Sequence, residues 1–361
     1  MSKISDPIYL PKAEFSECAT ALAYCVAQDA VYIQGNDNHI AVVAVGFTGD
    51  TLKPPITTKG RLRSICVRPG YTSDAFSSFF YRENPPELLE YDSLATQKFS
   101  VIGEVTIPDE FGGGYSISSL AFDADNNELY GVVEGPTFSG LVVINGKTNK
   151  YERKIDLRSH GMSNIDLSNI SVSRLRKVFV ANGLELNNES IFCVNDVDDS
   201  YVEQIYMPNI NGAPVTRVTG TIVDNVRDIL YAVCVADGEG DGDFSEHSIV
   251  YGFDIANKYK LIASSPVMDQ ELLMPVLNLE KRVLYLVAFP SQNGGAGKVI
   301  SRLVSLSLEK MDFVNSVELP EAIIESAVHL ARSGRVGLTT TRFSGAYPRP
   351  AFFIVDNPEV P

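Results

Sequence analysis

The chain has 361 residues, of which 45% are hydrophobic and 21% charged, and its formal net charge at pH 7 is −15. This acidic balance, without any run of Lys or Arg, argues against a nucleic-acid-binding protein and against docking on acidic lipid. No apolar segment reaches the roughly 18 residues of a membrane span, and the N-terminus lacks the apolar core of a signal peptide, so we expect neither membrane insertion nor secretion.

Strand-forming segments recur along the chain at a mean spacing of about 51 residues, which is typical of a repeat fold. Each repeat can be aligned on one residue of its second strand, namely Tyr32, Phe76, Tyr130, Phe179, Tyr231, Tyr285 and Gly337. The clearest repeat runs from Ser119 to Leu157 and predicts four short strands rich in β-branched and aromatic residues. The gaps between its strands carry the Asn, Asp and Gly that tight turns require.

The first strand of each repeat is also recognisable. It is predicted at Ala21–Cys25, Ser119–Asp123, Gly220–Asp224, Met274–Asn278 and Ser326–Leu330. One four-stranded meander cannot cover both of its own faces, so copies of it are expected to pack against one another. The pattern therefore predicts an all-β protein, a seven-bladed β-propeller of four-stranded antiparallel blades, with residues 1–361 forming a single domain.

The predicted blades span roughly residues 19–58, 59–108, 115–158, 168–209, 216–267, 272–320, and 324–361 together with 7–12. The last repeat is one strand short, whereas the N-terminus offers a spare strand at Pro7–Lys12. Pairing this strand into the last blade would protect an open sheet edge. We therefore expect the N-terminal strand to close the propeller.

Two segments carry a resemblance to a known family. Val178–Asp196 (VFVANG…SIFCVND) and Leu129–Leu157 (LYGVVEG…GLVVING) resemble the strands of the YVTN and lactonase-like seven-bladed propellers. The first, second and last repeats depart from that pattern. A WD40 propeller is disfavoured because no Trp-Asp dipeptide recurs, the chain having no tryptophan. The resemblance implies a small-molecule enzyme of the lactonase, isomerase or cyclase type, acting at the mouth of the channel.

Candidate catalytic residues fall in loops predicted on the face of the channel mouth. In the loop RSHGMSNID, His160 is the candidate general base, with Arg158 and Asp166 beside it. An arginine there would hold a carboxylate or a developing oxyanion of an anionic substrate. The candidate substrate-binding residues are Arg61, Arg217, Tyr115, His39 and His247. The fourth histidine, His329, is predicted in an inner strand and is interpreted as a core residue.

The acidic run Asp237–His247 suggests a calcium loop, because Asp237, Glu239, Asp241 and Asp243 alternate as oxygen ligands do. The bidentate glutamate that ends such a loop is absent, so a solvated hairpin is the favoured interpretation, and we expect no cofactor or metal. A metal site built from His39, His160 and His247 is not demanded by their spacing.

A second hypothesis is a non-catalytic interaction scaffold that binds a protein partner or a small ligand through its loops. The five cysteines, Cys18, Cys25, Cys66, Cys193 and Cys234, are odd in number and mostly lie in apolar runs. They are interpreted as reduced core thiols, which favours a cytoplasmic protein. The oligomeric state is not predicted by the sequence.

Overall fold

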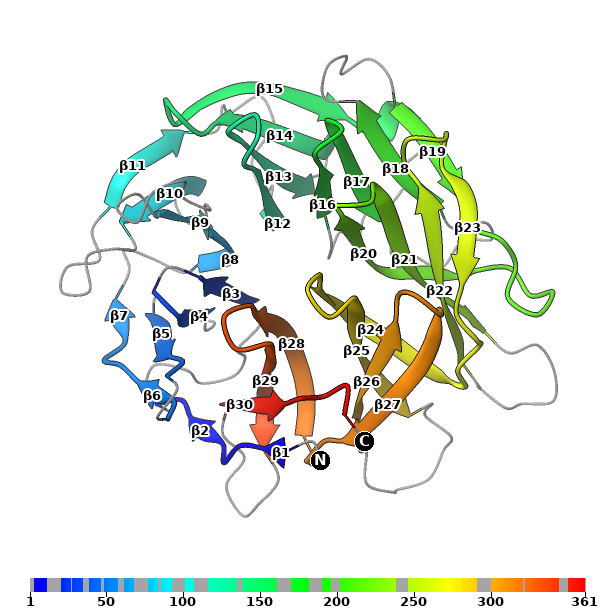
Figure 1. Ribbon diagram of the computed structural model, residues 1–361. Coiled ribbons are helices and arrows are strands. Elements are labelled where there is room, and N and C mark those ends of the chain that lie inside the picture. Colours follow the sequence, from blue (N-terminus) through cyan, green and yellow to red (C-terminus); the bar gives the residue numbers. More distant parts are fainter. Residues whose placement is uncertain are drawn as a thin grey trace. The chain divides into compact units, whose positions relative to one another are not determined.

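The strands of the chain form antiparallel sheets of the β-propeller type in a computed structural model (Figure 1). The structure describes residues 3–360 except 12–20, 27, 35–38, 47–48, 58–61, 68–76, 84–85, 93–100, 107–115, 135–137, 161–169, 182–189, 196–201, 238–245, 291–299, 321 and 344–349. Among these described residues, no helix has the length and apolar character that crossing a membrane requires.

The chain divides into two compact units. Unit 2 comprises Ile4–Asp156 and Ile323–Asp356. One sheet contains β3 (Ala21–Cys25), β4 (Ala30–Gln34), β5 (His39–Ala44), β6 (Thr51–Leu52) and β7 (Ile56–Thr57), and the next contains β8 (Leu62–Val67), β9 (Ser77–Glu83), β10 (Pro86–Asp92) and β11 (Val101–Thr106). A third sheet contains β12 (Ser116–Asp123), β13 (Glu128–Glu134), β14 (Ser139–Asn145) and β15 (Lys150–Asp156). The last sheet contains β28 (Ala322–Leu330), β29 (Arg335–Phe343) and β30 (Ala351–Asp356), together with the N-terminal strands β1 (Lys3–Ile4) and β2 (Ile8–Tyr9).

Unit 1 comprises Leu157–Ala322, with Lys3 and the C-terminal residues from Asn357. It begins with the short 3-10 helix η2 (Arg158–His160), which is followed by a sheet of β16 (Ile170–Ser173), β17 (Lys177–Ala181), β18 (Ser190–Asn195) and β19 (Val202–Tyr206). The next sheet contains β20 (Arg217–Asp224), β21 (Ile229–Asp237), β22 (Glu246–Asp254) and β23 (Lys260–Ser264). The third sheet of this unit contains β24 (Gln270–Asn278), β25 (Val283–Pro290), β26 (Arg302–Ser307) and β27 (Asp312–Glu318).

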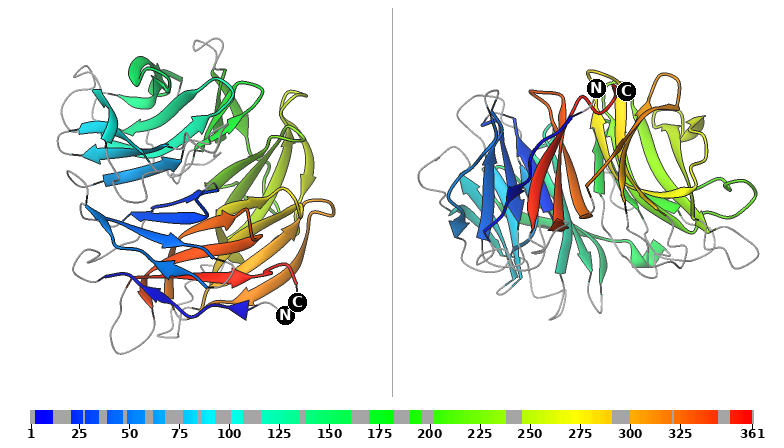
Figure 2. Two further views of the ribbon diagram at one scale, coloured as in Figure 1. Left: turned by 60° about the vertical axis from the view of Figure 1, so that its left-hand side comes forward. Right: turned by 90° about the horizontal axis from the view of Figure 1, so that it is seen from below.

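Each predicted repeat contains one of these sheets, and within a sheet the strands follow one another in chain order. Five sheets have the predicted four strands. The first and last sheets differ, because two short strands share the outer position: β6 and β7 both pair with β5, and β1 and β2 both pair with β30. The predicted pairing of the N-terminal strand with the last sheet is confirmed, since Ile8 and Tyr9 pair with Phe352 and Ala351 (Figure 2).

The alignment on one residue of the second strand is also confirmed. Tyr32, Tyr130, Phe179, Tyr231, Tyr285 and Gly337 all lie in second strands, whereas Phe76 lies outside the described residues. The five aromatic side chains in this set are almost fully buried. They fill the interior because every second residue of a strand points to the same face, and full burial of one such ring stabilises the fold by about 1.5–3 kcal/mol.

The turn between the first and second strands has the same backbone feature in every sheet where the structure describes it. The residue directly before the second strand has a positive φ in six sheets, at Asp29, Asn127, Arg176, Asp228, Arg282 and Gly334. A buried aspartate often caps this turn: Asp123 Oδ1 accepts the backbone N–H groups of Asp125 and Asn126 at 2.9 and 3.2 Å. Such side-chain caps satisfy backbone donors that the strands leave free.

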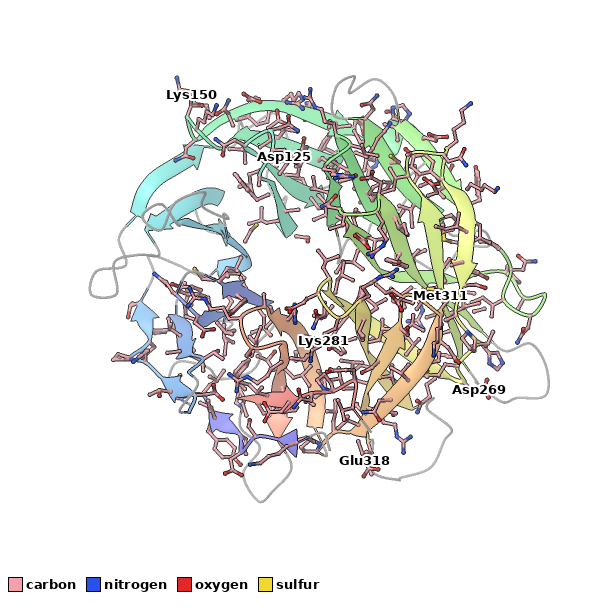
Figure 3. All side chains as sticks on the ribbon, in the orientation of Figure 1. Asp125, Lys150, Asp269, Lys281, Met311 and Glu318 are labelled. Atoms are coloured by element: carbon pink, nitrogen blue, oxygen red, sulfur yellow. The ribbon has the colours of Figure 1, made fainter. Side chains whose placement is uncertain are left out.

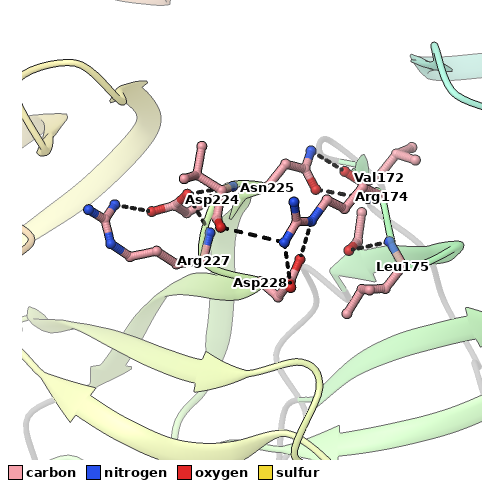
Figure 4. A network of polar contacts seen from close by, with 9 residues as sticks. Val172, Arg174, Leu175, Asp224, Asn225, Arg227 and Asp228 are labelled. Carbon is pink, nitrogen blue, oxygen red and sulfur yellow. Dashed lines mark hydrogen bonds and ion pairs between the residues drawn. The ribbon is translucent and has the colours of Figure 1, made fainter.

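In unit 1, neighbouring sheets are joined through these turns (Figure 4). The Arg174 guanidinium donates to Asp228 Oδ1 at 2.7 Å and to Oδ2 at 2.9 Å, and its backbone N–H donates to Asn225 Oδ1 at 2.9 Å. Further along the inner strands, Thr219 Oγ1 donates to the carbonyl of Leu272 at 2.7 Å. These contacts fix the spacing between consecutive inner strands, and they position the cluster described next.

Candidate functional site

A cluster of charged side chains lies in unit 1 where β20, β22 and β24 begin. We call it the Arg217 cluster; its members are Arg217, Glu246, His247, Asp269 and Glu271. Strands β20 and β22 are both antiparallel to β21, so their first residues lie at the same end of the sheet. The bond from Thr219 to Leu272 brings the start of β24 to that same end.

Arg217 is held between two carboxylates. One terminal nitrogen of its guanidinium lies 2.6 Å from Glu246 Oε1, and the other lies 3.0 Å from Glu271 Oε1. All three side chains are less than one third exposed. Because an arginine between two carboxylates already has its charge compensated, this guanidinium is poorly placed to bind a further anion.

The segment before β24 is tied to β22 by backbone and side-chain bonds. Ser248 and Met268 exchange two backbone hydrogen bonds, at 2.8 and 2.9 Å, and the buried Ser248 Oγ accepts the N–H of Leu272 at 3.0 Å. These hydrogen bonds place Asp269 beside His247, with Asp269 Oδ1 at 2.8 Å from His247 Nδ1. Asp269 is labelled in Figure 3 and is 81% exposed, so part of the cluster faces solvent.

The environment of Glu271 distinguishes it from the other carboxylates of the cluster. Burial raises the pKa of Glu271; the nearby Arg217 acts in the opposite direction, and the negative charge of Glu246 adds to the rise. Two carboxylates flanking one cation, in unequal environments, are the kind of arrangement from which acid–base pairs are built. The cluster as a whole is anionic, because its three carboxylates outnumber its one guanidinium.

The sequence-based candidates are only partly brought together. Arg217 is paired with Glu246 and Glu271, and His247, next to Glu246 in β22, is paired with Asp269. His160 and Arg158 lie on η2, whose residues are all exposed. His39 begins β5 in unit 2, and its buried Nδ1 atom has no hydrogen-bond partner among the residues that the structure describes. Asp166, Arg61 and Tyr115 lie outside the described residues.

The proposed calcium ligands also fall mostly outside the described part of the chain. Asp237 is the last residue of β21, and Glu239, Asp241 and Asp243 are not described. Within the described ranges, no group of three His, Cys, Asp or Glu side chains is arranged to hold a metal ion. His329 lies in β28, the inner strand in which it was predicted.

Sequence reasoning missed Glu246, Asp269 and Glu271. Each lies within one residue of the start of β22 or β24, but the sequence-based prediction placed Glu246 in a hairpin loop and began the inner strand only at Met274. Arg217 was predicted as a residue of a loop on the channel-mouth face, and it is the first residue of β20.

The comparisons with known proteins bear on the fold. No protein-family model matches the chain, and no curated protein matches it. Among solved structures, hydrazine synthase from Kuenenia stuttgartiensis is similar with a TM-score of 0.68 and 10% identity, over 91% of this chain and 94% of that one. The structure of U3-55K is similar with a TM-score of 0.63 and 11% identity, over 98% of both chains. At such identities the likeness establishes a β-propeller fold and nothing of the chemistry.

Proposed function

We propose that the protein is a non-catalytic β-propeller scaffold that binds a cationic group of a protein partner or small ligand at the Arg217 cluster. The observation that carries this proposal is the double pairing of Arg217 with Glu246 and Glu271. The positive charge of Arg217 is already compensated by these two carboxylates. The remaining negative charge of the cluster lies where β20, β22 and β24 begin, at the loop end of the sheets. Propellers commonly bind their ligands at such loop faces, where side chains stand on rigid strands.

The test is binding of a fluorescein-labelled hexalysine peptide, followed by fluorescence anisotropy. We expect the double variant Glu246→Gln/Glu271→Gln to bind at least tenfold more weakly than the wild type. Glu309→Gln is the matched control: it removes one carboxylate whose partner is Arg282, at the β26–β27 turn. Binding that weakens with added salt is expected from a charged contact. Equal affinity of the double variant and the wild type would exclude this site.

The half-buried Glu271 favours a second candidate function, an enzyme of the lactonase, isomerase or cyclase type that the family resemblance implies. A carboxyl group whose pKa is raised by burial holds its proton to a higher pH than an exposed carboxyl does, which favours a role as general acid. In this proposal Glu271 is the general acid, and the sequence-based roles of His160, Arg158 and Asp166 remain to be tested. The ligand is then a small molecule.

A panel of five- and six-membered lactones, with acid release followed in a pH-stat, tests the enzyme proposal. Loss of turnover in Glu271→Gln but not in His160→Ala would assign the acid to Glu271, and the reverse result would assign the chemistry to His160. Absence of turnover by the folded wild type on the whole panel would contradict the lactonase form of the proposal.

We also propose that the sheets are the blades of a propeller of the YVTN and lactonase-like type, and that the protein works in the cytoplasm. The strand patterns Val178–Asp196 and Leu129–Leu157 support the first part. The second is supported by reduced thiols at the described cysteines, Cys25, Cys66, Cys193 and Cys234, none of which forms a disulfide, since a reducing compartment keeps thiols from pairing in disulfides.

A further inference from the structure

Three residues of neighbouring strands form a single row across sheet β24–β27. Tyr285 of β25 pairs in register with Ser305 of β26, and Ser305 pairs with Asn315 of β27. Side chains at paired positions point to the same face of a sheet, so the row lies on one face. Tyr285 and Ser305 are fully buried, and buried polar groups require hydrogen-bond partners.

The C-terminal segment of the chain supplies those partners. Ser305 Oγ donates to the carbonyl oxygen of Pro358 at 2.9 Å, and Asn315 Nδ2 donates to the same oxygen at 2.7 Å. Asn315 Nδ2 also donates to the carbonyl of Val360 at 3.0 Å. Two side chains of the row therefore bind two alternate carbonyl groups of the segment, and Pro358 has no N–H that would need an acceptor.

Between those two carbonyls lies Glu359, whose side chain is only 16% exposed. Its carboxylate accepts a hydrogen bond from the Tyr285 hydroxyl at 2.9 Å and forms an ion pair with Lys281. Asn278 Nδ2 is 3.5 Å from the same hydroxyl, so a buried amide also contacts the donor. Burial alone would raise the pKa of Glu359, but the hydrogen bonds from Lys281 and Tyr285 outweigh it and lower the pKa.

These contacts describe a peptide-binding site with defined specificity. We propose that the row Tyr285–Ser305–Asn315, with Lys281, binds extended peptide segments that carry Pro-Glu, and that Pro358–Val360 of this chain occupy the site as an intramolecular competitor. Hydrogen bonds to backbone carbonyls supply affinity for any extended segment, and the Lys281–Tyr285 pair selects a glutamate. A partner protein with this motif would have to displace a tethered segment, whose effective concentration is of millimolar order.

Because the segment Pro358–Val360 competes with any added peptide, releasing it by mutation should increase peptide binding by the chain of residues 1–361. The probe is a fluorescein-labelled peptide with the chain's own C-terminal sequence, DNPEVP, and binding is measured by fluorescence anisotropy. The variant Glu359→Lys places a like charge beside Lys281 and should release the segment. We expect this variant to bind the probe at least tenfold more tightly than the wild type. The same probe with Gln in place of Glu should lose most of that affinity.

Glu309→Lys is the matched control, because it makes the same charge change next to Arg282 and leaves the C-terminal segment in place. We expect it to bind the probe as weakly as the wild type. Should circular dichroism show that Glu359→Lys is unfolded, the milder Glu359→Gln takes its place. A folded variant that binds the probe no better than the wild type, or that binds the Glu and Gln probes equally, overturns the proposal. Dimers of the wild type that the probe dissociates would assign the site to a second copy of the chain and also overturn it.

Discussion

The ring of Phe352 fills the space beside Gly337. A Cβ atom added to Gly337 would lie 2.7 Å from both Cε2 and Cζ of that ring, closer than side-chain carbons approach one another. Gly337 stands at the repeat position that other sheets fill with Tyr or Phe. In the last sheet the aromatic side chain thus comes from the third strand, β30, and the second strand, β29, provides room for it.

We expect Gly337→Ala to lower the free energy of unfolding by about 1–3 kcal/mol, because an added methyl group in a filled interior forces the ring to shift. Urea denaturation followed by tyrosine fluorescence measures this change. The control is Gly252→Ala, whose Cβ would lie 3.3 Å from Tyr231 Cε1 and require a smaller adjustment. Equal loss in the two variants would show that glycine is required for its backbone freedom rather than for space.

The sequence predicted this fold well because its signals are local. Alternating apolar residues place the strands, and Asn, Asp and Gly place the turns. The sheets therefore follow the predicted repeats closely, although β24 and β28 each begin two residues before the predicted boundary and β1 lies outside the predicted N-terminal strand. The split outer strands of the first and last sheets were not foreseen, since a two-residue strand such as Thr51–Leu52 has no periodicity to detect. The charge cluster was harder to predict, because Glu246 and Glu271 reach Arg217 from different sheets.

The positive φ before the second strand leads to a prediction for two equivalent positions. Gly334 has a φ of 69° and Arg176 has a φ of 60°. A residue with a Cβ costs about 1–2 kcal/mol in this region of conformational space. We expect Gly334→Ala to destabilise the protein and the exposed Arg176→Gly to change its stability little or raise it, as measured by thermal unfolding. Destabilisation of similar size in both variants would contradict this explanation.

The bond between Arg174 and Asp228 gives a pH-dependent contribution to stability. The hydrogen bond from Arg174 lowers the pKa of Asp228. The stabilisation is therefore present above the ordinary aspartate pKa and is lost as the pH falls through the lowered value. We expect Asp228→Asn to cost about 0.5–1 kcal/mol at neutral pH and to reduce the loss of stability in acid. The same substitution at the exposed turn residue Asp125 serves as control, and an identical acid profile in both would refute the role of Asp228.

Glu271 is expected to act in the opposite direction. Its pKa is raised by burial, so the folded state binds the proton more tightly than the unfolded chain does. Stability should then fall as the pH rises from the ordinary glutamate pKa through the raised one. We expect Glu271→Gln to abolish this fall in urea titrations at a series of pH values. Arg217→Ala, which removes the opposing charge, should enlarge it, and a variant with an unchanged pH profile would contradict the assignment.

The exchange of ring and glycine between strands limits how this protein can be rebuilt. Tyr231 projects from a second strand over Gly252 of the third, whereas Phe352 projects from a third strand over Gly337 of the second. A single strand grafted from one sheet into the other would either bring two rings into one place or leave a hole the size of a ring. The smallest interchangeable part of this architecture is therefore the hairpin of second and third strands, and recombination libraries should place their crossovers outside it.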